Sequence, residues 1–416
     1  MTPAKGYTEM KDSGIPSIGD IPSAWNITRI HNLFFEVSEK YSETNDDFLP
    51  LLSVSEYYGV AERAEKIDSD SILIRAETLD GYKKCKEGDI VSNIMLTWKG
   101  ALGRSPKCGI VSPAYCVYRP RPGVNSRFYH YLFRTISYQD IFRINSTGLI
   151  DSRLRLYSPK FFVIQTIVPP KEEQEKIVSY LDTQCAKIDE IIDQAKASIE
   201  DYKQWKAAII YEAVTKGLDP NVEMKESGVP WIGKMPVNWT ISALKNLCTM
   251  QAGKNLTSEQ ISTSGQYPVY GGNGQRGYYS AYNADGHFLL IGRQGARCGN
   301  VHDVTGKFWA TEHAVVTSAT KVTNVCYLYY LLIAMNLNQY ASNSAAQPGL
   351  SVGNILNLKA LLPPINEQAR ISKFLDDFCS KIDVILTEKQ SLIGDLESYK
   401  KSLIYEVVTG KRRVCK

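Results

Sequence analysis

The sequence predicts an α+β protein with a pseudo-twofold internal repeat. Two mixed α/β bodies are expected to be joined and separated by two long helices that form an antiparallel coiled coil. Three observations predict this fold: a duplicated head segment, a duplicated tail segment with a heptad pattern, and strand-like runs in the bodies between them. The 416 residues, of which 44% are hydrophobic and 22% charged, suffice for two or three domains with their own cores.

The composition excludes several classes of protein. The longest apolar run, residues 325–335, is shorter than the ~20 residues that cross a membrane. The first residues contain no apolar signal region, and none of the nine cysteines forms a C-x-x-C pair. We therefore expect a cytoplasmic protein with reduced thiols, without disulfides or a zinc site.

The head segments are the first repeat. Residues 11–25 recur as residues 225–239, and both copies contain Gly-Ile/Val-Pro-x-Ile-Gly-x-x-Pro-x-x-Trp. The tail segments are the second repeat, because residues 169–215 recur as residues 363–409. Both tails open with Pro-Pro-x-x-Glu-Gln-x-x-Ile-x-x-x-Leu-Asp. The repeats predict domains at 1–168 and 218–362, with spacer helices at 169–217 and 363–416.

Each tail carries apolar residues at alternating spacings of four and three, which is the seam of a coiled coil. A helix of this length, about 68 Å, needs a partner for its apolar stripe. Because the two seams match, each tail is expected to pack antiparallel on the other; the alternative is that each packs alone on its own body. The predicted seam consists of Leu181, Ile188, Ile192, Ile199, Leu375, Ile382, Leu386, Ile393 and Leu396.

The bodies predict a shared mixed α/β fold with different loops. Strands are expected at residues 48–55, 89–94 and 114–118 in the first body, and at 288–292 and 314–317 in the second. Helices are expected at residues 128–137 and 325–337.

Glycine-rich loops and a basic stretch are the candidate DNA-binding features. The loops at 267–279 and 292–300 combine glycine with Asn, Gln, Arg and Tyr, side chains that contact base edges and phosphates. Residues 99–160 carry 11 basic and only 2 acidic side chains, an excess that suits phosphates. The alternatives are plain glycine turns and a basic face that pairs with the acidic first part of the chain. The candidate DNA contacts are Lys99, Arg104, Ser105, Lys107, Arg153, Arg155, Tyr270, Asn273, Gln275, Arg276, Arg293, Gln294, Arg297, Lys307 and Asn354.

Catalytic motifs are absent from the sequence. It contains no H-E-x-x-H, no G-x-S-x-G and no phosphate-binding G-x-x-x-x-G-K-[ST] motif. The five histidines show no spacing typical of a shared metal. We expect no catalytic residue, no metal site and no bound cofactor in this chain.

The doubled heads and tails resemble the specificity (S) subunits of type I restriction–modification enzymes, and the resemblance covers essentially the whole chain. It implies that the bodies are target recognition domains, each reading one half of a bipartite, asymmetric sequence in double-stranded DNA. It implies that the coiled coil sets the half-site spacing and docks two methyltransferase (M) subunits, which methylate adenine N6 with S-adenosylmethionine. Restriction (R) subunits would join the complex and cleave DNA with ATP and Mg²⁺.

Two other functions remain open from the residues alone. One is a stand-alone nucleic-acid-modifying enzyme or nuclease, which would need a metal or cofactor site. The other is a structural adaptor whose tails hold partner proteins and whose bodies have no affinity for DNA.

Overall fold

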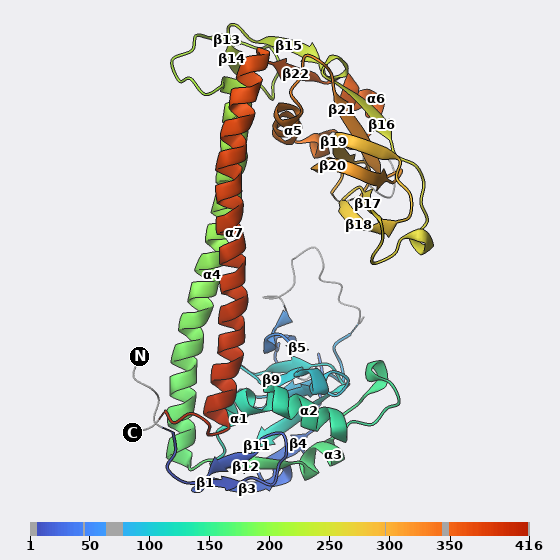
Figure 1. Cartoon of the computed structure of the whole chain (residues 1–416). Coiled ribbons are helices and arrows are strands. Elements are labelled where there is room, and N and C mark those ends of the chain that lie inside the picture. Colours follow the sequence, from blue (N-terminus) through green and yellow to red (C-terminus); the bar gives the residue numbers. More distant parts are fainter. Residues whose placement is uncertain (1–5, 45, 64–77, 296, 343–348, 415–416) are drawn as a thin grey trace. The chain divides into compact units, whose positions relative to one another are not determined.

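The computed structural model describes residues 6–44, 46–63, 78–295, 297–342 and 349–414. The chain forms two compact units: unit 1 comprises residues 1–194 and 392–416, and unit 2 comprises residues 195–391. Each unit contains one head, one body and a part of both long helices (Figure 1).

Unit 1 is built on a four-stranded antiparallel sheet with the order β4-β11-β8-β9. All four residues of the central strand β8 are buried. The strands span β4 (Phe34–Val37), β8 (Ile90–Asn93), β9 (Leu102–Arg104) and β11 (Tyr115–Pro120). Four antiparallel pairs complete the unit: β1 (Met10–Asp12) with β2 (Asp20–Pro22), β3 (Asn26–Arg29) with β12 (Gln165–Val168), β5 (Leu52–Ser55) with β6 (Gly59–Glu62), and β7 (Lys83–Cys85) with β10 (Gly109–Val111).

Unit 2 is built on a six-stranded sheet with the order β16-β21-β19-β20-β17-β18. Its strands span β16 (Cys248–Ala252), β17 (Tyr267–Gly271), β18 (Gly274–Tyr279), β19 (Ala284–Gly292), β20 (Val301–Ala310) and β21 (Ala314–Ala319). Two further antiparallel pairs are β13 (Met224–Glu226) with β14 (Lys234–Pro236), and β15 (Thr240–Ala243) with β22 (Lys359–Leu362). The first four strands in the sheet follow the same chain order as β4-β11-β8-β9, and the β17–β18 hairpin extends the sheet beyond β20.

Helices α1 (Ser126–Phe133) and α5 (Val325–Ala334) begin in the same way in the two units. The Asn125 side chain accepts hydrogen bonds from the first backbone N–H groups of α1, and Asn324 does so for α5. Helix α5 ends before the predicted residue 337, because Asn336 takes the left-handed conformation (φ 44°). The smaller helices are α3 (Ser158–Val163) in unit 1 and α6 (Val352–Leu356) in unit 2.

The single helix predicted at 128–137 is wrong: it is two helices, α1 and α2 (Ile136–Asn145). The break lies at Thr135, whose backbone is extended and whose hydroxyl donates to the Leu132 carbonyl at 2.8 Å. A threonine side chain competes in this way with the hydrogen bonds of a continuing helix.

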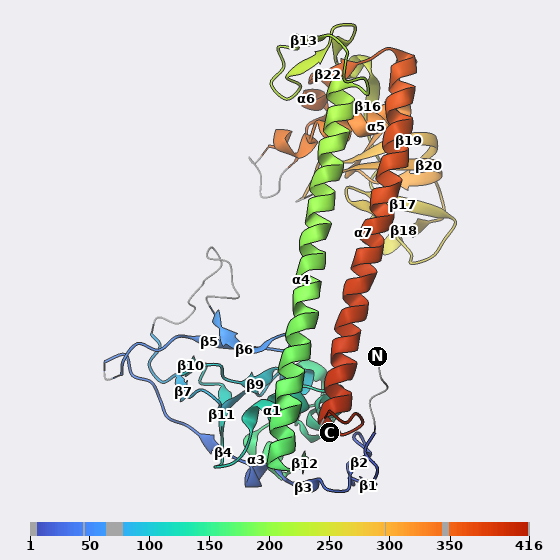
Figure 2. The ribbon, with the colours of Figure 1, turned by 90° about the vertical axis from the view of Figure 1, so that its left-hand side faces the viewer.

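The two tails are the long helices α4 (Lys171–Lys216) and α7 (Ile365–Val408), and each starts directly after its Pro-Pro pair. Both end at a glycine in the left-handed region, Gly217 (φ 79°) and Gly410 (φ 73°). Within each unit the two helices lie side by side (Figures 1 and 2).

The helices are antiparallel, as the sequence predicts. In unit 2, Trp205 of α4 packs edge-to-face on Phe378 of α7, and Lys389 of α7 lies 5.6 Å from the ring of Tyr202 of α4. The earlier residue of α4 thus contacts the later residue of α7, so the two helices run in opposite directions. In the part of the chain that the structure describes, no helix is long and apolar enough to cross a membrane.

Most predicted seam residues are buried between the helices. Leu181, Ile188 and Leu375 are at most 6% exposed, whereas Leu386 and Leu396 of α7 are partly exposed. The other predicted seam positions are also buried: Ile192, Ile199, Ile382 and Ile393. The heptad pattern therefore identifies most of the buried face of the two helices.

Candidate nucleic-acid interface

An open pocket of about 350 Å³ in unit 2 brings several candidate DNA contacts together. It lies where the β17–β18 hairpin meets the turns that follow β19 and β20. The pocket is lined by Gly272, Asn273, Gln275, Arg276, Gln294 and His313. Four of these residues belong to the predicted contacts, and His313 is a neighbour that the sequence patterns did not single out.

Glycine is required at the base of this pocket. A Cβ atom on Gly292 would lie 2.1 Å from the Gly272 carbonyl oxygen, so the two backbones approach too closely for any side chain. The Arg293 N–H donates to the His313 carbonyl at 2.9 Å, and the Thr311 N–H donates to the Tyr270 carbonyl at 2.9 Å. The glycines therefore allow the loops that follow β17, β19 and β20 to pack together and form one surface.

The polar groups of the pocket match the hydrogen-bonding groups of base edges. Asn and Gln amides pair with adenine, and the Arg guanidinium pairs with guanine. His313 Nε2 lies 3.2 Å from one carboxylate oxygen of Glu312. The other Glu312 oxygen and the buried Thr311 hydroxyl have no hydrogen-bond partner among the described residues. The side-chain amides of the pocket lining supply both donors and acceptors.

The remaining unit 2 candidates lie outside the pocket lining. Tyr270 is partly buried and packs edge-to-face on Phe308. Arg297 donates to Asn273 Oδ1 at a long 3.4 Å, and Lys307 lies 4.9 Å from the ring of Tyr282. The backbone N–H of Arg293 is hydrogen-bonded to the His313 carbonyl. Asn354 is exposed on α6, which packs against β16 at the opposite edge of the sheet from β18.

The candidate segments of unit 1, residues 98–107 and 151–155, lie next to each other. The Leu156 N–H donates to the Ile94 carbonyl at 2.9 Å, which joins the two loops at their ends. Arg143 connects them further, because it pairs with Asp151 at 2.9 Å and lies 5.5 Å from the ring of Trp98. The exposed side chains of Lys99 and Arg153 belong to this surface.

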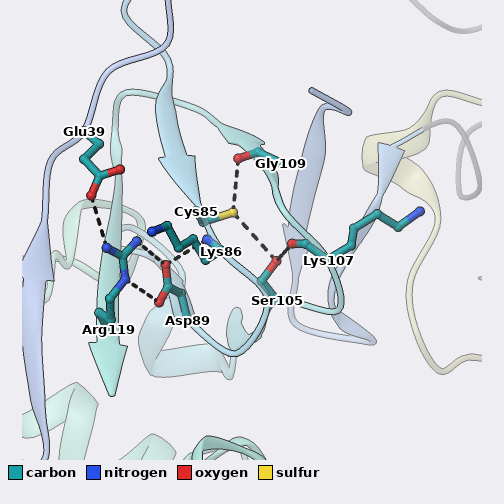
Figure 3. A network of polar contacts seen from close by, with 8 residues as sticks. All are labelled: Glu39, Cys85, Lys86, Asp89, Ser105, Lys107, Gly109 and Arg119. Atoms are coloured by element: carbon teal, nitrogen blue, oxygen red, sulfur yellow. Dashed lines mark hydrogen bonds and ion pairs between the residues drawn. The ribbon is translucent and has the colours of Figure 1, made fainter. Parts of the chain in front are cut away.

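Ser105 differs from the other candidates because it is fully buried. Its hydroxyl donates to the Lys107 carbonyl at 2.7 Å and lies 3.7 Å from the sulfur of Cys85 (Figure 3). Burial raises the pKa of the Cys85 thiol to about 11, so the thiol stays protonated and donates to the Gly109 carbonyl. Ser105 therefore supports its loop from the inside and presents no atom to a ligand.

Most arginines of the basic stretch bind groups of the protein itself. Figure 3 shows Arg119 held by the buried Asp89 and by Glu39, and these bonds raise the pKa of Arg119. The other internal partners are Glu87 for Arg104, the His31 carbonyl for Arg121, Asp182 for Arg127, backbone carbonyls for Arg134 and Asp151 for Arg143.

Pairing with the acidic first part of the chain thus accounts for part of this charge. Lys107 is also paired with an acidic residue of that part, Glu62, at 2.6 Å. Among the described residues no partner is found for the exposed Arg153, and Arg155 buries its Nη1 atom without one. Of these two arginines, the exposed Arg153 is the one that an external anion can reach.

Two lysines that interrupt the heptad pattern make reciprocal ion pairs between the long helices. Lys206 lies 2.6 Å from Asp383 in unit 2, and Lys400 lies 2.6 Å from Asp189 in unit 1. The four residues occupy matching positions in the two tails. The duplicated tails contained the signal for these pairs, because both lysines and both aspartates recur 194 residues apart.

The described residues contain no group of three or more His, Cys, Asp or Glu side chains that could hold a metal ion. Burial lowers the pKa of His130 in unit 1 to about 3. Its Nδ1 atom accepts a hydrogen bond from the Arg104 N–H at 3.1 Å, which is a structural role.

Comparison with known proteins gives a consistent result. Residues 236–393 match the family described as "Type I restriction modification DNA specificity domain". The chain is 48% identical over 139 residues to the type I restriction enzyme EcoprrI specificity subunit of Escherichia coli, which is 32% of this chain and 34% of that relative. It is 22% identical over 439 residues to the MjaVIII specificity subunit of Methanocaldococcus jannaschii, covering 95% and 94% of the two chains.

Two solved structures share the fold over nearly the whole chain. One, described as addressing complex assembly and conformational transition of the type I R-M system, gives a TM-score of 0.68 at 14% identity and covers 93% of this chain and 98% of its own. The other, the HsdS subunit from Thermoanaerobacter tengcongensis, gives a TM-score of 0.50 at 15% identity and covers 94% and 98%.

Proposed function

We propose that this chain, which its family match, curated relatives and fold relate to the specificity subunits of type I restriction–modification enzymes, recognises a bipartite, asymmetric sequence of double-stranded DNA. Unit 1 reads one half-site and unit 2 reads the other. The paired helices α4 and α7 fix the number of base pairs between the half-sites.

The observation that carries the proposal is the contrast between a repeated scaffold and two unlike surfaces. Unit 2 presents amides, an arginine and a histidine around a pocket, whereas unit 1 presents cations and exposed apolar side chains. Surfaces of different chemistry on one scaffold suit two different half-sites, because base edges are distinguished by the pattern of donors, acceptors and methyl groups.

The partners follow from the same proposal. Two methyltransferase subunits dock on the helices and methylate adenine N6 with S-adenosylmethionine. Restriction subunits join them and use ATP and Mg²⁺ to cleave DNA. In this arrangement the chain is the non-catalytic recognition subunit, and all of these cofactors are held by its partners.

The experiment is a domain exchange read out by methylation. Residues 30–165 are replaced by the corresponding segment of a related chain with a different target, and the methylated motif is sequenced in cells that also carry the methyltransferase partner. We expect one half of the motif to change while the other half and the spacer stay the same. An unchanged motif, or metal-dependent cleavage of DNA by the purified chain alone, would contradict the proposal.

A further inference from the structure

The loop of residues 146–155 in unit 1 carries two exposed aliphatic side chains at its tip. Leu149 is 101% exposed and Ile150 is 56% exposed. In Figure 1 the chain between α2 and α3 extends outward past both helices. Single exposed apolar residues are common on protein surfaces, but two adjacent ones at the tip of a projecting loop are a feature that needs a partner.

The base of this loop is tightly built. Thr147 and Arg155 exchange both backbone hydrogen bonds, at 2.9 and 3.0 Å. A Cβ atom on Gly148 would lie 2.6 Å from the Arg153 carbonyl oxygen, so the two sides of the loop are in contact there. The Arg153 N–H donates to the Ile150 carbonyl at 2.8 Å, which forms the turn that presents the tip. The apolar tip is therefore held out by a closed and hydrogen-bonded base.

The surroundings of the tip are basic. Arg153 is exposed within the loop. Arg143 pairs with Asp151, next to Ile150, and lies 5.5 Å from the Trp98 ring of the neighbouring segment, where Lys99 lies 5.2 Å from the same ring. That neighbouring segment also carries two partly exposed apolar side chains, Met95 at 38% and Leu96 at 37%. An apolar tip with the exposed Arg153 in the same loop and Lys99 in the neighbouring segment is complementary to a polyanion that contains stacked apolar groups, which is the chemistry of a DNA duplex.

We propose that Leu149 and Ile150 form a wedge that inserts between base pairs of the DNA bound by unit 1 and unstacks them. Leucine and isoleucine serve as such wedges in proteins that kink DNA, while flanking cations hold the phosphates. Because base steps differ in how easily they unstack, the wedge adds sequence preference at a step whose edges no side chain reads. The inference rests on the proposed function, since it concerns how unit 1 engages its half-site.

The test uses the full-length chain and a duplex that this chain selects from a random-sequence library. The duplex carries 2-aminopurine at successive positions of the unit 1 half-site, so that unstacking is seen as increased fluorescence. We expect the wild-type chain to raise the fluorescence at one step. The double variant Leu149→Ala, Ile150→Ala is expected to lose that signal and at least tenfold in affinity. The Ile365→Ala variant, with a side chain 51% exposed in unit 2, is the control and should behave as wild type.

A mismatch at the unstacked step separates the wedge from other roles of the loop. The mismatch removes most of the unstacking cost, so it should restore most of the affinity that the double variant loses. The Arg153→Ala variant should instead lower the salt dependence of binding and leave the fluorescence signal in place.

Failure of the wedge and failure of the proposed function give different results. If the wild-type chain selects no duplex, DNA recognition itself is overturned. If it selects one, and the double variant binds and unstacks that duplex as wild type does, only the wedge is overturned. Normal DNA binding with loss of a copurified protein partner would also overturn it, because the tip would then be a protein-docking site.

Discussion

The indole Nε1 of Trp25 donates a hydrogen bond of 2.9 Å to Oε2 of Glu173, and so joins the first head to the first turn of α4. In unit 2 the indole of Trp239 donates to Glu367 at the same distance of 2.9 Å. Both tryptophan rings are fully buried. The two residues are 148 positions apart in the first repeat and 128 in the second, yet both repeats make the same contact, which joins each head to the helix that follows its body.

The first prediction concerns this contact. Trp25→Phe keeps most of the buried ring but leaves the Glu173 carboxylate without its indole donor, which should lower the free energy of unfolding by about 1–3 kcal/mol. Trp239→Phe should have a similar effect in unit 2. Urea unfolding followed by circular dichroism measures both, and Trp205→Phe, at a site 48% exposed, is the control. Equal unfolding curves for all three variants would contradict the prediction.

The second prediction concerns the ion pair Lys206–Asp383. Its lysine and aspartate side chains are 26% and 57% exposed, so each single substitution by Ala should cost no more than about 1 kcal/mol. Lys206→Asp should cost more, because it places two carboxylates together. The combined variant Lys206→Asp, Asp383→Lys should recover most of that loss. A double-mutant cycle in urea measures the coupling, and a coupling of zero would show that the pair does not hold the helices in register.

The third prediction concerns the seam. Ile188→Asp buries a charge without a partner and should destabilise the chain by several kcal/mol, whereas Ile191→Asp, at a site 45% exposed, should cost little. Ile382→Asp is the matching change in α7. Thermal unfolding gives the stability, and the methylated motif of the complex gives the spacer. An unaltered spacer and affinity in a destabilised Ile188→Asp chain would contradict the proposed role of the helices.

The fourth prediction separates the arginines of unit 2. Arg276 lines the pocket, so Arg276→Ala should weaken binding by about 1–3 kcal/mol on a duplex whose half-site it reads, and should relax specificity at one position. Arg293→Ala and Arg297→Ala, outside the lining, should weaken binding to all sequences alike if they contact phosphate. Binding titrations on matched and single-substituted duplexes, each at several salt concentrations, make the distinction. Uniform loss for Arg276→Ala would assign it to phosphate.

The fifth prediction is a pH dependence of stability. Burial lowers the pKa of His130 to about 3, so the unfolded chain binds a proton there near pH 6.5 while the folded chain does not. The stability contributed by neutral His130 is present above pH 6.5 and is lost as the pH falls toward 3, by up to about 1.4 kcal/mol per pH unit. His130→Asn keeps an acceptor for the Arg104 N–H and should flatten the pH profile of urea unfolding. His31→Asn, at an exposed site, is the control.

The repeats predicted the scaffold well, because heads and tails carry regular patterns with a direct physical meaning. The Pro-Pro pairs stand directly before α4 and α7, and the heptads indicate most of the buried face, whereas α7 ends at Val408 and not at the predicted residue 416. The break at Thr135 could not be predicted, because a single threonine is compatible with a continuous helix. In the structure the Thr135 hydroxyl instead donates to the Leu132 carbonyl at the point where α1 ends.

The candidate contacts were predicted less completely, for a physical reason. Composition shows which side chains can meet DNA but not which already have partners within the protein. Arg104 and Lys107 are paired with acidic residues far away in the sequence, and Ser105 is buried beneath its own loop. The pocket residue His313 was missed because it is brought to the glycine loops by the pairing of strands, through its carbonyl bond with the Arg293 N–H.

The position of the β17–β18 hairpin has a consequence for how such chains diversify. It attaches to the outer edge of β20, next to a four-stranded core that both units share, and it supplies Asn273, Gln275 and Arg276 to the pocket. In unit 1 the corresponding edge strand, β9, is covered by α1 and β6 instead. Different elements can therefore be added at this edge strand, which changes the side chains around the proposed DNA-binding surface without changing the shared four-stranded core.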